Sequence, residues 1–385
     1  MTLSTKPRAR DLGVPFDGQP GALNAITDVQ GVTVGHCTLI QGEAVRTGVT
    51  ALFPLGRDAN EGVPAAVFAF NGTGELTGAH QIAEYGGFFG PVLLTGTLGV
   101  GTASQACLRW VARQTTDDDV RFTRTLPVVA ETWDGNLHDA WGFALQPEHV
   151  WQALDTAQGG PVDEGTVGGG TGMICHGLKG GIGTASRCFE QCGSQHTVGV
   201  LVQANQGLRD DLLVAGLPAG RWIQGSTPDL PPEKAALGDG SIIVVIATDV
   251  PLHPAQLARV AKRATVGVAR TGGFGGSLSG EIFLAFSTAA AAGRIVLGTE
   301  GASPSTPHPG DALDPLFHAT AWAVEEAIVN ALVAADTMTG LNGLRIHRLP
   351  HAPLRVLMQR RKQMLEVLVP ADPAVLAAVP TETRI

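Results

Sequence analysis

Short apolar runs recur along the whole chain, together with longer stretches that carry apolar residues at helical spacing. Apolar runs of about four to eight residues, rich in β-branched residues, are typical of strands. The predicted strands are residues 31–39, 50–53, 65–70, 127–131, 197–203, 241–247 and 281–287. Predicted helices begin near Ser104, Pro254 and Asp314; a proline or an acidic residue favours a helix start at the last two. Strands and helices are therefore expected to be mixed along the chain.

The most hydrophobic run, residues 242–246, begins directly after Ser241. Its β-branched residues predict a strand buried on both faces, although a buried helix segment has the same apolar pattern. Residues 238–240, Gly-Asp-Gly, have the composition of a turn, and residues 217–237, with four prolines and two glycines, are the best linker candidate. Ser241 is thus expected at a junction between loop and strand. The simpler interpretation is a strand whose first residue happens to be polar.

Composition and charge narrow the classes of protein. The 385 residues are enough for one large core or two domains, and 44% of them are hydrophobic and 16% charged, unlike a disordered chain. The net charge of −9 and the lack of any block of lysine and arginine argue against nucleic-acid binding. No apolar run approaches the roughly 18 residues of a membrane span, and no apolar segment follows the basic N-terminus as in a secretory signal. Five cysteines without framework spacing favour reduced thiols and a cytoplasmic location.

A glycine-rich run, residues 166–187, invites comparison with phosphate-binding loops. A P-loop requires serine or threonine after its lysine, whereas Lys179 is followed by Gly180. A dinucleotide-binding fingerprint requires a strand before the glycines, and the sequence QGGPVDEG there is not typical of a strand. The run therefore gives only weak support to nucleotide binding, and no cofactor is expected.

The sequence also gives only weak support for a metal site or for a serine–histidine–aspartate triad. Cys188 and Cys192 could pair with His176 or His196, but no second ligand cluster follows them. The chain has no G-x-S-x-G nucleophile elbow. Serine–histidine–aspartate catalysis stays open as a class, because nothing in the spacing selects one set among the eleven histidines.

A different set of residues is more informative. Ser241 opens one predicted strand, and Ser279 and Glu281 lie at the entry to the next; if both strands start at the same end of one sheet, the three side chains converge. A serine hydroxyl needs a base, and cleavage of the peptide bond between Gly240 and Ser241 would create one in the new α-amine, with an ordinary pKa of about 7.7–8.0. Ser279 and Glu281 could hold that amine and relay protons. The alternative is a serine-lined turn with a solvated glutamate.

Six segments in order along the chain resemble the DmpA-type family of L-aminopeptidase D-amidase/D-esterases and β-peptidyl aminopeptidases. These segments are residues 23–36, 46–54, 128–139, 168–187, 198–207 and 239–252. Members of that family are made as one inactive chain that cuts itself at a glycine–serine bond. The resemblance therefore implies a single domain, 1–385, that is cut between Gly240 and Ser241 into residues 1–240 and 241–385. It also implies an α+β fold, a four-layer αββα sandwich like that of N-terminal-nucleophile hydrolases but with different connectivity.

The resemblance also implies roles for individual residues. Ser241 matches the nucleophile, Ser279 and Glu281 its supporting pair, and Asn205 an oxyanion-hole donor. Glu131, in the segment ETWDG, matches the carboxylate that pairs with the free amine of the substrate.

One position departs from the family pattern. Trp133 stands where the family commonly has tyrosine, and an indole N–H can donate a hydrogen bond but cannot accept a proton. The catalytic rate and the substrate range are the properties that this difference would affect.

The expected function is thus a self-processing serine aminopeptidase or amidase without a cofactor. Its partners are small peptide, amino-acid amide or ester substrates of L-, D- or β-residues, and a homo-oligomer of αβ pairs, with a tetramer favoured. Two alternatives remain. One is an acyltransferase or amide-oligomer hydrolase of a related fold, a class that opens its cut chain with threonine. The other is an uncleaved, non-catalytic binding protein.

Overall fold

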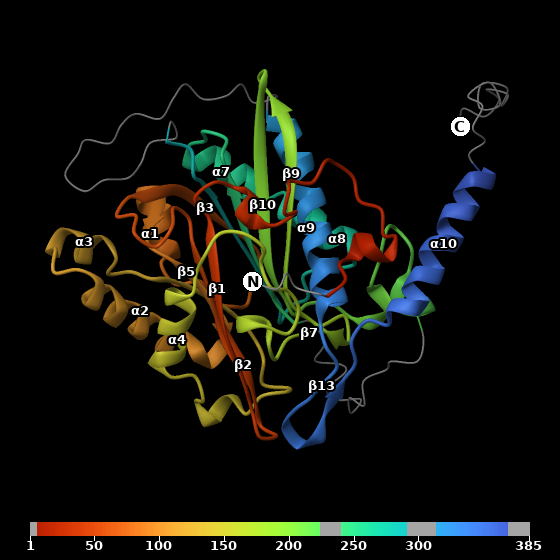
Figure 1. Ribbon diagram of the computed structural model, residues 1–385, viewed down its shortest axis with the longest axis horizontal. Coiled ribbons are helices and arrows are strands. Elements are labelled where there is room, and N and C mark those ends of the chain that lie inside the picture. The colour runs from red at the N-terminus through yellow and green to blue at the C-terminus, as the bar shows by residue number, and fades with distance from the viewer. Residues whose placement is uncertain (1–5, 224–239, 291–312, 369–385) are drawn as a thin grey trace.

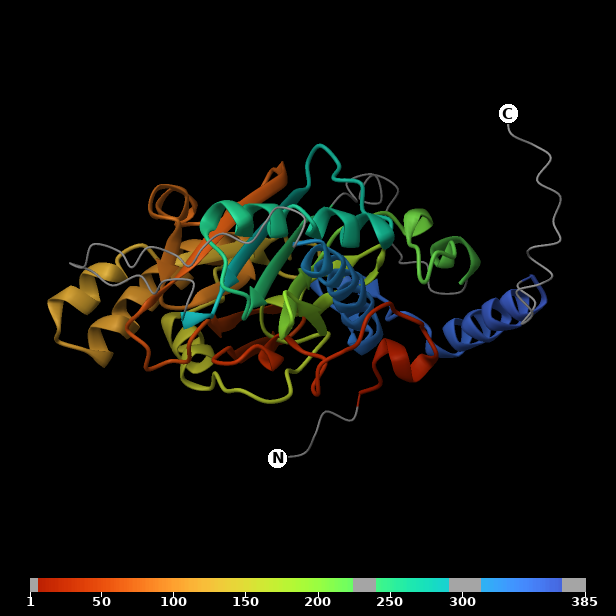
Figure 2. The same cartoon turned by 90° about the horizontal axis from the view of Figure 1, so that it is seen from above.

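The computed structural model describes residues 6–223, 240–290 and 313–368. Two β-sheets lie face to face, and helices cover the outer face of each one (Figures 1 and 2). One apolar cluster fills the space between the sheets, and two others lie between a sheet and its helices. The order of layers is therefore helix, sheet, sheet, helix, which confirms the predicted αββα sandwich.

The larger sheet has six strands in the order β4-β3-β12-β11-β10-β9. Their bounds in that order are Gly87–Phe89, Gly62–Gly72, Gly280–Ser287, Ile242–Thr248, Ser194–Ala204 and Gly181–Gln191. Only β11 and β12 run parallel, and the remaining neighbours are antiparallel. Parallel neighbours need a crossover connection, and the helices α7 and α8 provide it.

The smaller sheet has four strands in the order β1-β2-β5-β6. Their bounds are Thr33–Gln41, Val45–Phe53, Val92–Gly96 and Val128–Thr132. Here β5 and β6 are the parallel pair, and the connection between them contains α2 and α3. Two short ribbons complete the strands: β7 (Ile174–Cys175) with β8 (Leu178–Lys179), and β13 (Met338–Thr339) with β14 (Arg345–Ile346).

The two crossovers supply α2, α3, α7 and α8, and further helices precede or follow them along the chain. The bounds are Ala79–Tyr85 for α1, Val100–Gln114 for α2, Asp118–Thr123 for α3, Pro147–Asp155 for α4, Ala219–Trp222 for α5, Pro254–Ala261 for α7, Ala264–Arg270 for α8, Asp314–Ala334 for α9 and His351–Leu368 for α10. Helices α2 and α4 cover the smaller sheet, and α7, α8 and α9 cover the larger one (Figure 2).

The position of strand β11 in the larger sheet explains why residues 242–246 are all apolar. Ile242, Val244 and Ile246 belong to the cluster under the helices, whereas Ile243 and Val245 belong to the cluster between the sheets. A strand buried on both faces has no polar side to present, so alternation disappears from its sequence. The prediction of a doubly buried strand is confirmed, and the alternative of a buried helix segment is wrong.

Strand β9 was not predicted, because its glycines gave the stretch the character of a loop. Gly183 is required because α9 packs directly on the strand backbone, and Gly181 because the backbone of Gly165 lies against it. A Cβ atom on Gly183 would lie 2.0 Å from the carbonyl oxygen of Ala327 in α9. Glycine in a strand often marks such a close approach, and this approach exists only in the folded chain.

The predicted helices are confirmed with corrections at their ends. Helix α9 begins at Asp314 as predicted, α2 begins at Val100 rather than Ser104, and the run from Pro254 is two helices instead of one. Strands β4 and β5 and helices α4 and α10 were not predicted. Of the predicted linker, residues 217–223 contain the short helix α5, and Ala219 and Ile223 are buried in the core. Its remainder, 224–237, lies outside the described residues.

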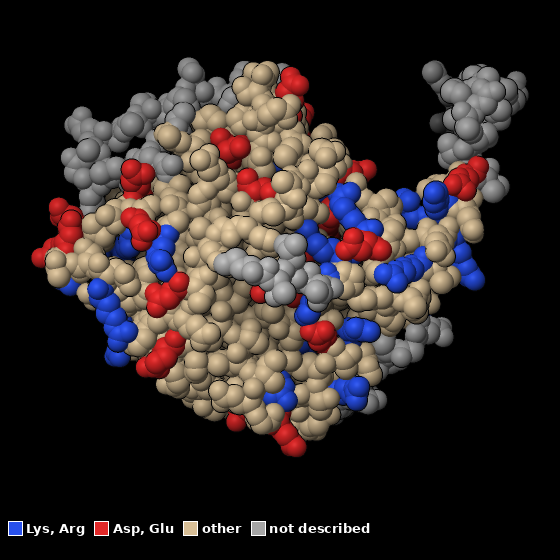
Figure 3. Space-filling model, in the orientation of Figure 1, with Lys and Arg blue, Asp and Glu red and all other residues tan. Residues whose placement is uncertain are grey.

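Helix α10 projects from the body of the molecule (Figures 1 and 2) and carries Arg355, Arg360, Arg361 and Lys362. Elsewhere on the face in Figure 3, basic and acidic side chains are interspersed. Within the described ranges, no helix is both long and apolar enough to cross a membrane.

Buried charges tie the N-terminal segment to α9. Glu326 is fully buried and accepts hydrogen bonds from Arg10 (2.8 Å) and Arg187 (2.7 Å), and its other neighbour Asn24 donates to the same carboxylate at 2.6 Å. Burial by itself would raise the pKa of Glu326, but these hydrogen bonds and the two guanidinium charges bring it below its ordinary value. The cluster joins the N-terminal segment, β9 and α9.

Removing this carboxylate should cost more than removing an exposed one. Glu326→Ala leaves the buried Arg187 guanidinium without its partner, and a broken buried pair typically costs about 3–5 kcal/mol. We expect a clearly lower urea midpoint, followed by tryptophan fluorescence. The control is Asp58→Ala, which removes an exposed carboxylate 4.0 Å from Arg57 and should leave the midpoint unchanged. Equal midpoints for the two variants would contradict a stabilising role of the cluster.

Candidate active site

The parallel pairing of β11 with β12 brings the predicted serine and glutamate together. Ile242 lies opposite Glu281 in the register, so Ser241 and the segment Ser279–Glu281 meet at the same end of the larger sheet. All three side chains are buried. The expectation that both strands start at one end of one sheet is confirmed.

Hydrogen bonds connect this group to the peptide bond before Ser241. The backbone N–H of Gly280 donates to Ser241 Oγ at 3.1 Å. Ser279 Oγ lies within hydrogen-bond distance of two oxygens, the carbonyl oxygen of Gly240 and one carboxylate oxygen of Glu281. Because Ser279 has a single hydroxyl proton, it can donate to one of them at a time. Ser279 therefore stands between the carboxylate and the carbonyl of the bond that the resemblance marks for cleavage.

Asn205 lies next to both Gly240 and Ser241. It follows β10, and its backbone N–H donates to the carbonyl oxygen of Ser241 at 3.1 Å. Its side-chain Oδ1 accepts from the Ile174 N–H at 2.7 Å, and its Nδ2 donates to the Trp133 carbonyl at 3.1 Å. An amide NH2 has two hydrogens, so Nδ2 retains one for a further acceptor.

Gly240 is in close contact with Asn205. A Cβ atom on Gly240 would lie 1.7 Å from the Asn205 carbonyl oxygen and 3.0 Å from Nδ2. Only glycine fits there, because the first contact is with rigid backbone. The requirement for glycine before the serine is thus steric, and the Asn205 amide nitrogen lies beside the Gly240–Ser241 peptide.

Glu131 lies at the C-terminal end of β6, buried and close to this group. Thr97 donates from its hydroxyl to Oε2, and the Glu75 N–H donates to Oε1 at 3.0 Å. A Cβ atom on Gly74 would be 3.2 Å from Oε1 and 3.5 Å from Gly280 Cα, so only the width of a small group separates the carboxylate from Gly280. The structure therefore places the Glu131 carboxylate near Gly280, which lies between Ser279 and Glu281.

The electrostatic environment of the Glu131 carboxylate favours binding of a cation that is not part of the chain. Burial raises the pKa of Glu131, the hydrogen bonds from Thr97 and the Glu75 N–H oppose this, and the nearby Asp134 and Glu75 carboxylates raise it further. No ion pair involves Glu131 within the part of the chain that is described. A buried carboxylate without a cation is costly, and a substrate ammonium would offset that cost.

Trp133 contacts the candidate site more clearly through its backbone carbonyl than through its indole ring. Its carbonyl oxygen accepts from Asn205, while the indole lies over Gly135, where a Cβ atom would come within 2.1 Å of the ring. Trp133 as a whole is 39% exposed. An effect of the tryptophan on the catalytic rate or the substrate range stays a prediction.

Several contacts of the site were not predicted from the sequence. They come from Thr97 and from the backbone N–H groups of Glu75, Gly280 and Ile174. The position of Thr97 could have been inferred from the sequence. Thr97 follows the apolar run of β5, and β5 is parallel to β6. Polar residues that follow two parallel strands meet at the same edge of the sheet. The backbone donors have no signal in the side-chain pattern.

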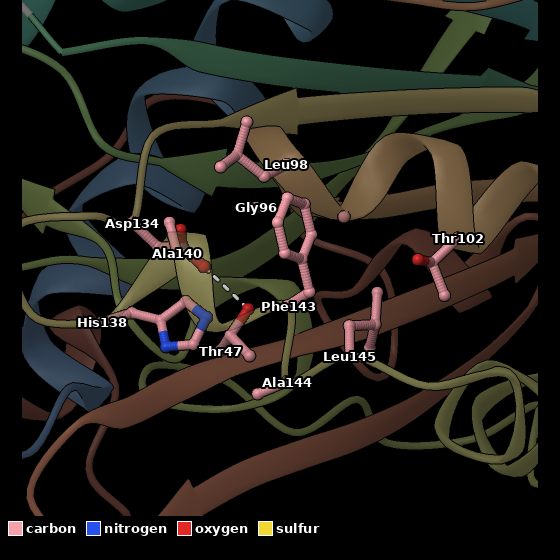
Figure 4. Close-up of a pocket in the computed structure, with 11 residues that line it drawn as sticks. Thr47, Gly96, Leu98, Thr102, Asp134, His138, Ala140, Phe143, Ala144 and Leu145 are labelled. Carbon is pink, nitrogen blue, oxygen red and sulfur yellow. Dashed lines mark hydrogen bonds between the residues drawn. The ribbon is translucent and has the colours of Figure 1, made fainter.

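A small cavity of about 20 Å³ lies next to Asp134, the residue after Trp133 (Figure 4). Thr47 donates to the buried Asp134 carboxylate at 2.7 Å, and the ring of His138 lies beside them. This volume is enough for about one water molecule, so the cavity is too small for a peptide substrate.

The candidate metal ligands do not gather. His176 is buried with Nδ1 donating to the Leu208 carbonyl at 2.9 Å, and His196 contacts Asp249 at 3.1 Å. Among the residues described, no three histidine, cysteine or acidic side chains form a group that could hold a metal ion.

Comparison with known proteins gives the family. The model of a family described as peptidase family S58 matches residues 24–346. This chain belongs to peptidase family S58. The resemblance drawn from the six sequence segments is therefore confirmed, and so is the prediction that the chain is a hydrolase.

Relatives within the S58 family match over most of their length. The beta-peptidyl aminopeptidase BapA of Sphingosinicella xenopeptidilytica is 48% identical over 372 residues, which cover 92% of each chain. The L-aminopeptidase D-Ala-esterase/amidase of Ochrobactrum anthropi, described as a prototype for the serine aminopeptidases and a variant of the Ntn hydrolase fold, superimposes with a TM-score of 0.84 at 45% identity, over 93% of this chain and 99% of that one. A beta-aminopeptidase from a Burkholderia species gives 0.83 at 44% identity, over 92% and 99%.

The raised pKa of Glu131 predicts that its charge destabilises the free protein. A carboxyl whose pKa is raised by folding binds protons more tightly in the folded state, so the stability of the fold falls as the pH rises above about 4.5. Glu131→Gln should therefore have a higher thermal midpoint than the parent at pH 7, and the difference should shrink towards pH 4. Glu84→Gln, on an exposed part of α1, is the control without an effect. A lower midpoint at pH 7 for Glu131→Gln would contradict a destabilising charge at this position.

Proposed function

We propose that this S58 chain is a self-processing serine aminopeptidase, which cuts itself between Gly240 and Ser241 and then removes N-terminal residues from short peptides, amides or esters. The observation that carries the proposal is the contact of Ser279 Oγ with the Gly240 carbonyl oxygen, directly beside Ser241. The names of the S58 relatives support the aminopeptidase, amidase and esterase classes for this chain.

Self-cutting follows from the arrangement around Gly240. Ser241 Oγ attacks the Gly240 carbonyl carbon, the C–N bond to Ser241 breaks, and the hydroxyl proton passes to the released amine. Ser279 donates to the carbonyl oxygen as charge develops on it, and the remaining N–H of Asn205 Nδ2, which lies beside Gly240, supplies a second donor. Water then hydrolyses the ester, which leaves a Gly240 carboxylate and a Ser241 with a free α-amine.

Turnover uses the same groups. The Ser241 α-amine takes the hydroxyl proton, Oγ attacks the substrate carbonyl, and the proton passes to the leaving amine or alcohol. The acyl group is then transferred from Oγ to water. Glu281, through Ser279, holds the amine in place, and Asn205 stabilises the oxyanion.

Glu131 accounts for exopeptidase action. Its carboxylate, held by Thr97 and the Glu75 N–H, is free to pair with an ammonium group. The free N-terminus of a substrate supplies that cation, whereas an internal peptide bond does not.

The other expected classes have less support. A related acyltransferase or amide-oligomer hydrolase would begin its cut chain with threonine, and this chain has serine at 241. An uncleaved binding protein would have no need for the contact of Ser279 with the Gly240 carbonyl. The cytoplasmic location and the oligomer of αβ pairs remain proposals; five free cysteines support the first of them.

Ser241→Ala tests the shared nucleophile. Because one hydroxyl serves both reactions, the variant should run as a single full-length band on a denaturing gel and lack amidase activity, whereas the parent gives two bands of unequal size. Ser277→Ala, in the loop before Ser279, is the matched control and should be cut like the parent. Two bands from Ser241→Ala would disprove the assignment.

Blocking the substrate amine tests Glu131. N-acetylation of a good aminoacyl amide removes the ammonium and leaves the buried carboxylate without a partner. A hydrogen bond to a charged group is worth roughly 1.5–3 kcal/mol, so kcat/KM should fall by at least about tenfold. Methylation of the leaving amide nitrogen keeps the ammonium and serves as the control. Equal kcat/KM for free and acetylated substrates would remove Glu131 from this role.

A further inference from the structure

Lys179 lies in the glycine-rich run that was compared with a P-loop. Because the run does not match a P-loop, the sequence assigns no role to this lysine. Its side chain is completely buried, and its ammonium donates to three backbone carbonyls, those of Gly170 (3.2 Å), Met173 (2.9 Å) and Gly180 (3.0 Å). An ammonium has three hydrogens, so none is left for a phosphate. The lysine therefore binds the glycine-rich run itself.

The segment that Lys179 holds, residues 168–174, lies between the two sheets. A Cβ atom on Gly169 would come within 2.1 Å of Gln203 Oε1, and one on Gly170 within 2.4 Å of the Ile182 nitrogen. Backbone packed this tightly has few donors nearby for its carbonyl groups. Buried carbonyls need partners, and the Lys179 ammonium supplies them from inside the turn.

This segment ends on the residue that orients Asn205. Ile174 lies directly opposite Lys179 in the β7–β8 ribbon, and the Ile174 N–H donates to Asn205 Oδ1 at 2.7 Å. A backbone N–H can only donate, so it fixes Oδ1 on its side and turns Nδ2 towards the Trp133 carbonyl and Gly240. The Trp133 carbonyl can only accept and fixes Nδ2 in the same sense, so these two contacts together set the direction of the amide.

Burying the lysine has an energetic cost. Burial lowers the pKa of Lys179 to about 7, with Asp336, Lys6 and Cys175 as the titratable groups that act on it, and Lys6 and Asp336 pair with each other at 2.6 Å. A buried ammonium is retained only where good acceptors compensate its lost hydration. Its three carbonyl partners are all within or next to the glycine-rich turn.

We propose that Lys179 is a positioning residue: its ammonium braces residues 168–174 and thereby holds the Ile174 N–H that orients the Asn205 amide. The inference rests on the proposed role of Asn205 as the oxyanion donor. Lys179 acts through this segment and touches neither the substrate nor Ser241.

Lys179→Met is the first test, because methionine has a similar length but no donor. We expect the rate of self-cutting and the kcat on an aminoacyl amide to fall at least about tenfold, below the roughly 10²–10³-fold effect of losing an oxyanion donor outright. KM should stay within about twofold, because ground-state binding is not changed. Lys262→Met, at an exposed position between α7 and α8, removes the same charge and should behave like the parent.

A double-mutant cycle on the rate of self-cutting separates positioning from general damage. If Lys179 acts through Asn205, then Lys179→Met should slow the Asn205→Ala variant by less than about twofold. If Lys179→Met does not fold, Lys179→Gln decides, since its amide keeps two donors and should give an intermediate rate. Parental rates in Lys179→Met or Lys179→Gln, a change in KM alone, or losses that multiply in the cycle would each overturn the inference. Failure of the proposed function is distinct, because the parent itself would then stay uncut and inactive.

Discussion

The parallel pairing of β11 with β12 is the constraint on which the candidate site depends. Parallel strands begin at the same end of a sheet, so the first residue of one lies beside the first residues of the other. In this chain that geometry places Ser241 next to Ser279 and Glu281. The crossover that parallel pairing requires also supplies α7 and α8, which cover one face of the sheet.

Glycine is the second requirement of the site, because several backbone segments approach one another too closely for side chains to lie between them. Gly240 fits against Asn205, Gly183 fits under α9, and Gly169 and Gly170 fit between the sheets. Each contact is with backbone or with a side chain fixed by hydrogen bonds, so an added methyl group has no room. The many glycines therefore reflect close packing around the site rather than a phosphate-binding loop.

Charges inside the molecule are of two kinds. Glu326 is fully paired, with arginines on two other segments of the chain, and its cluster joins parts that self-cutting would separate, since Arg10 and Arg187 precede residue 241 and Glu326 follows it. Glu131 has hydrogen bonds but no ion pair within the described residues, and burial raises its pKa. We expect the first kind to stabilise the fold and the second to lower its stability, and the proposed function gives the second a substrate cation as its partner.

The sequence by itself determined the layered α+β class, the doubly buried strand 242–246 and, through six segments in order, the family. It could do so because a strand buried on both faces has an unbroken apolar run and because a glycine–serine pair before it is a local signal. It did not reveal β9, whose Gly183 is explained only by the packing of α9 on the strand. Nor did it reveal the donors Gly280 and Ile174, whose N–H groups have no signal in the side-chain pattern. Those contacts join residues far apart in the chain, as Ile174 with Asn205 and Gly280 with Ser241 show. Only the tertiary structure decides them, since close packing of backbones and the direction of a buried amide depend on neighbours that local sequence does not specify.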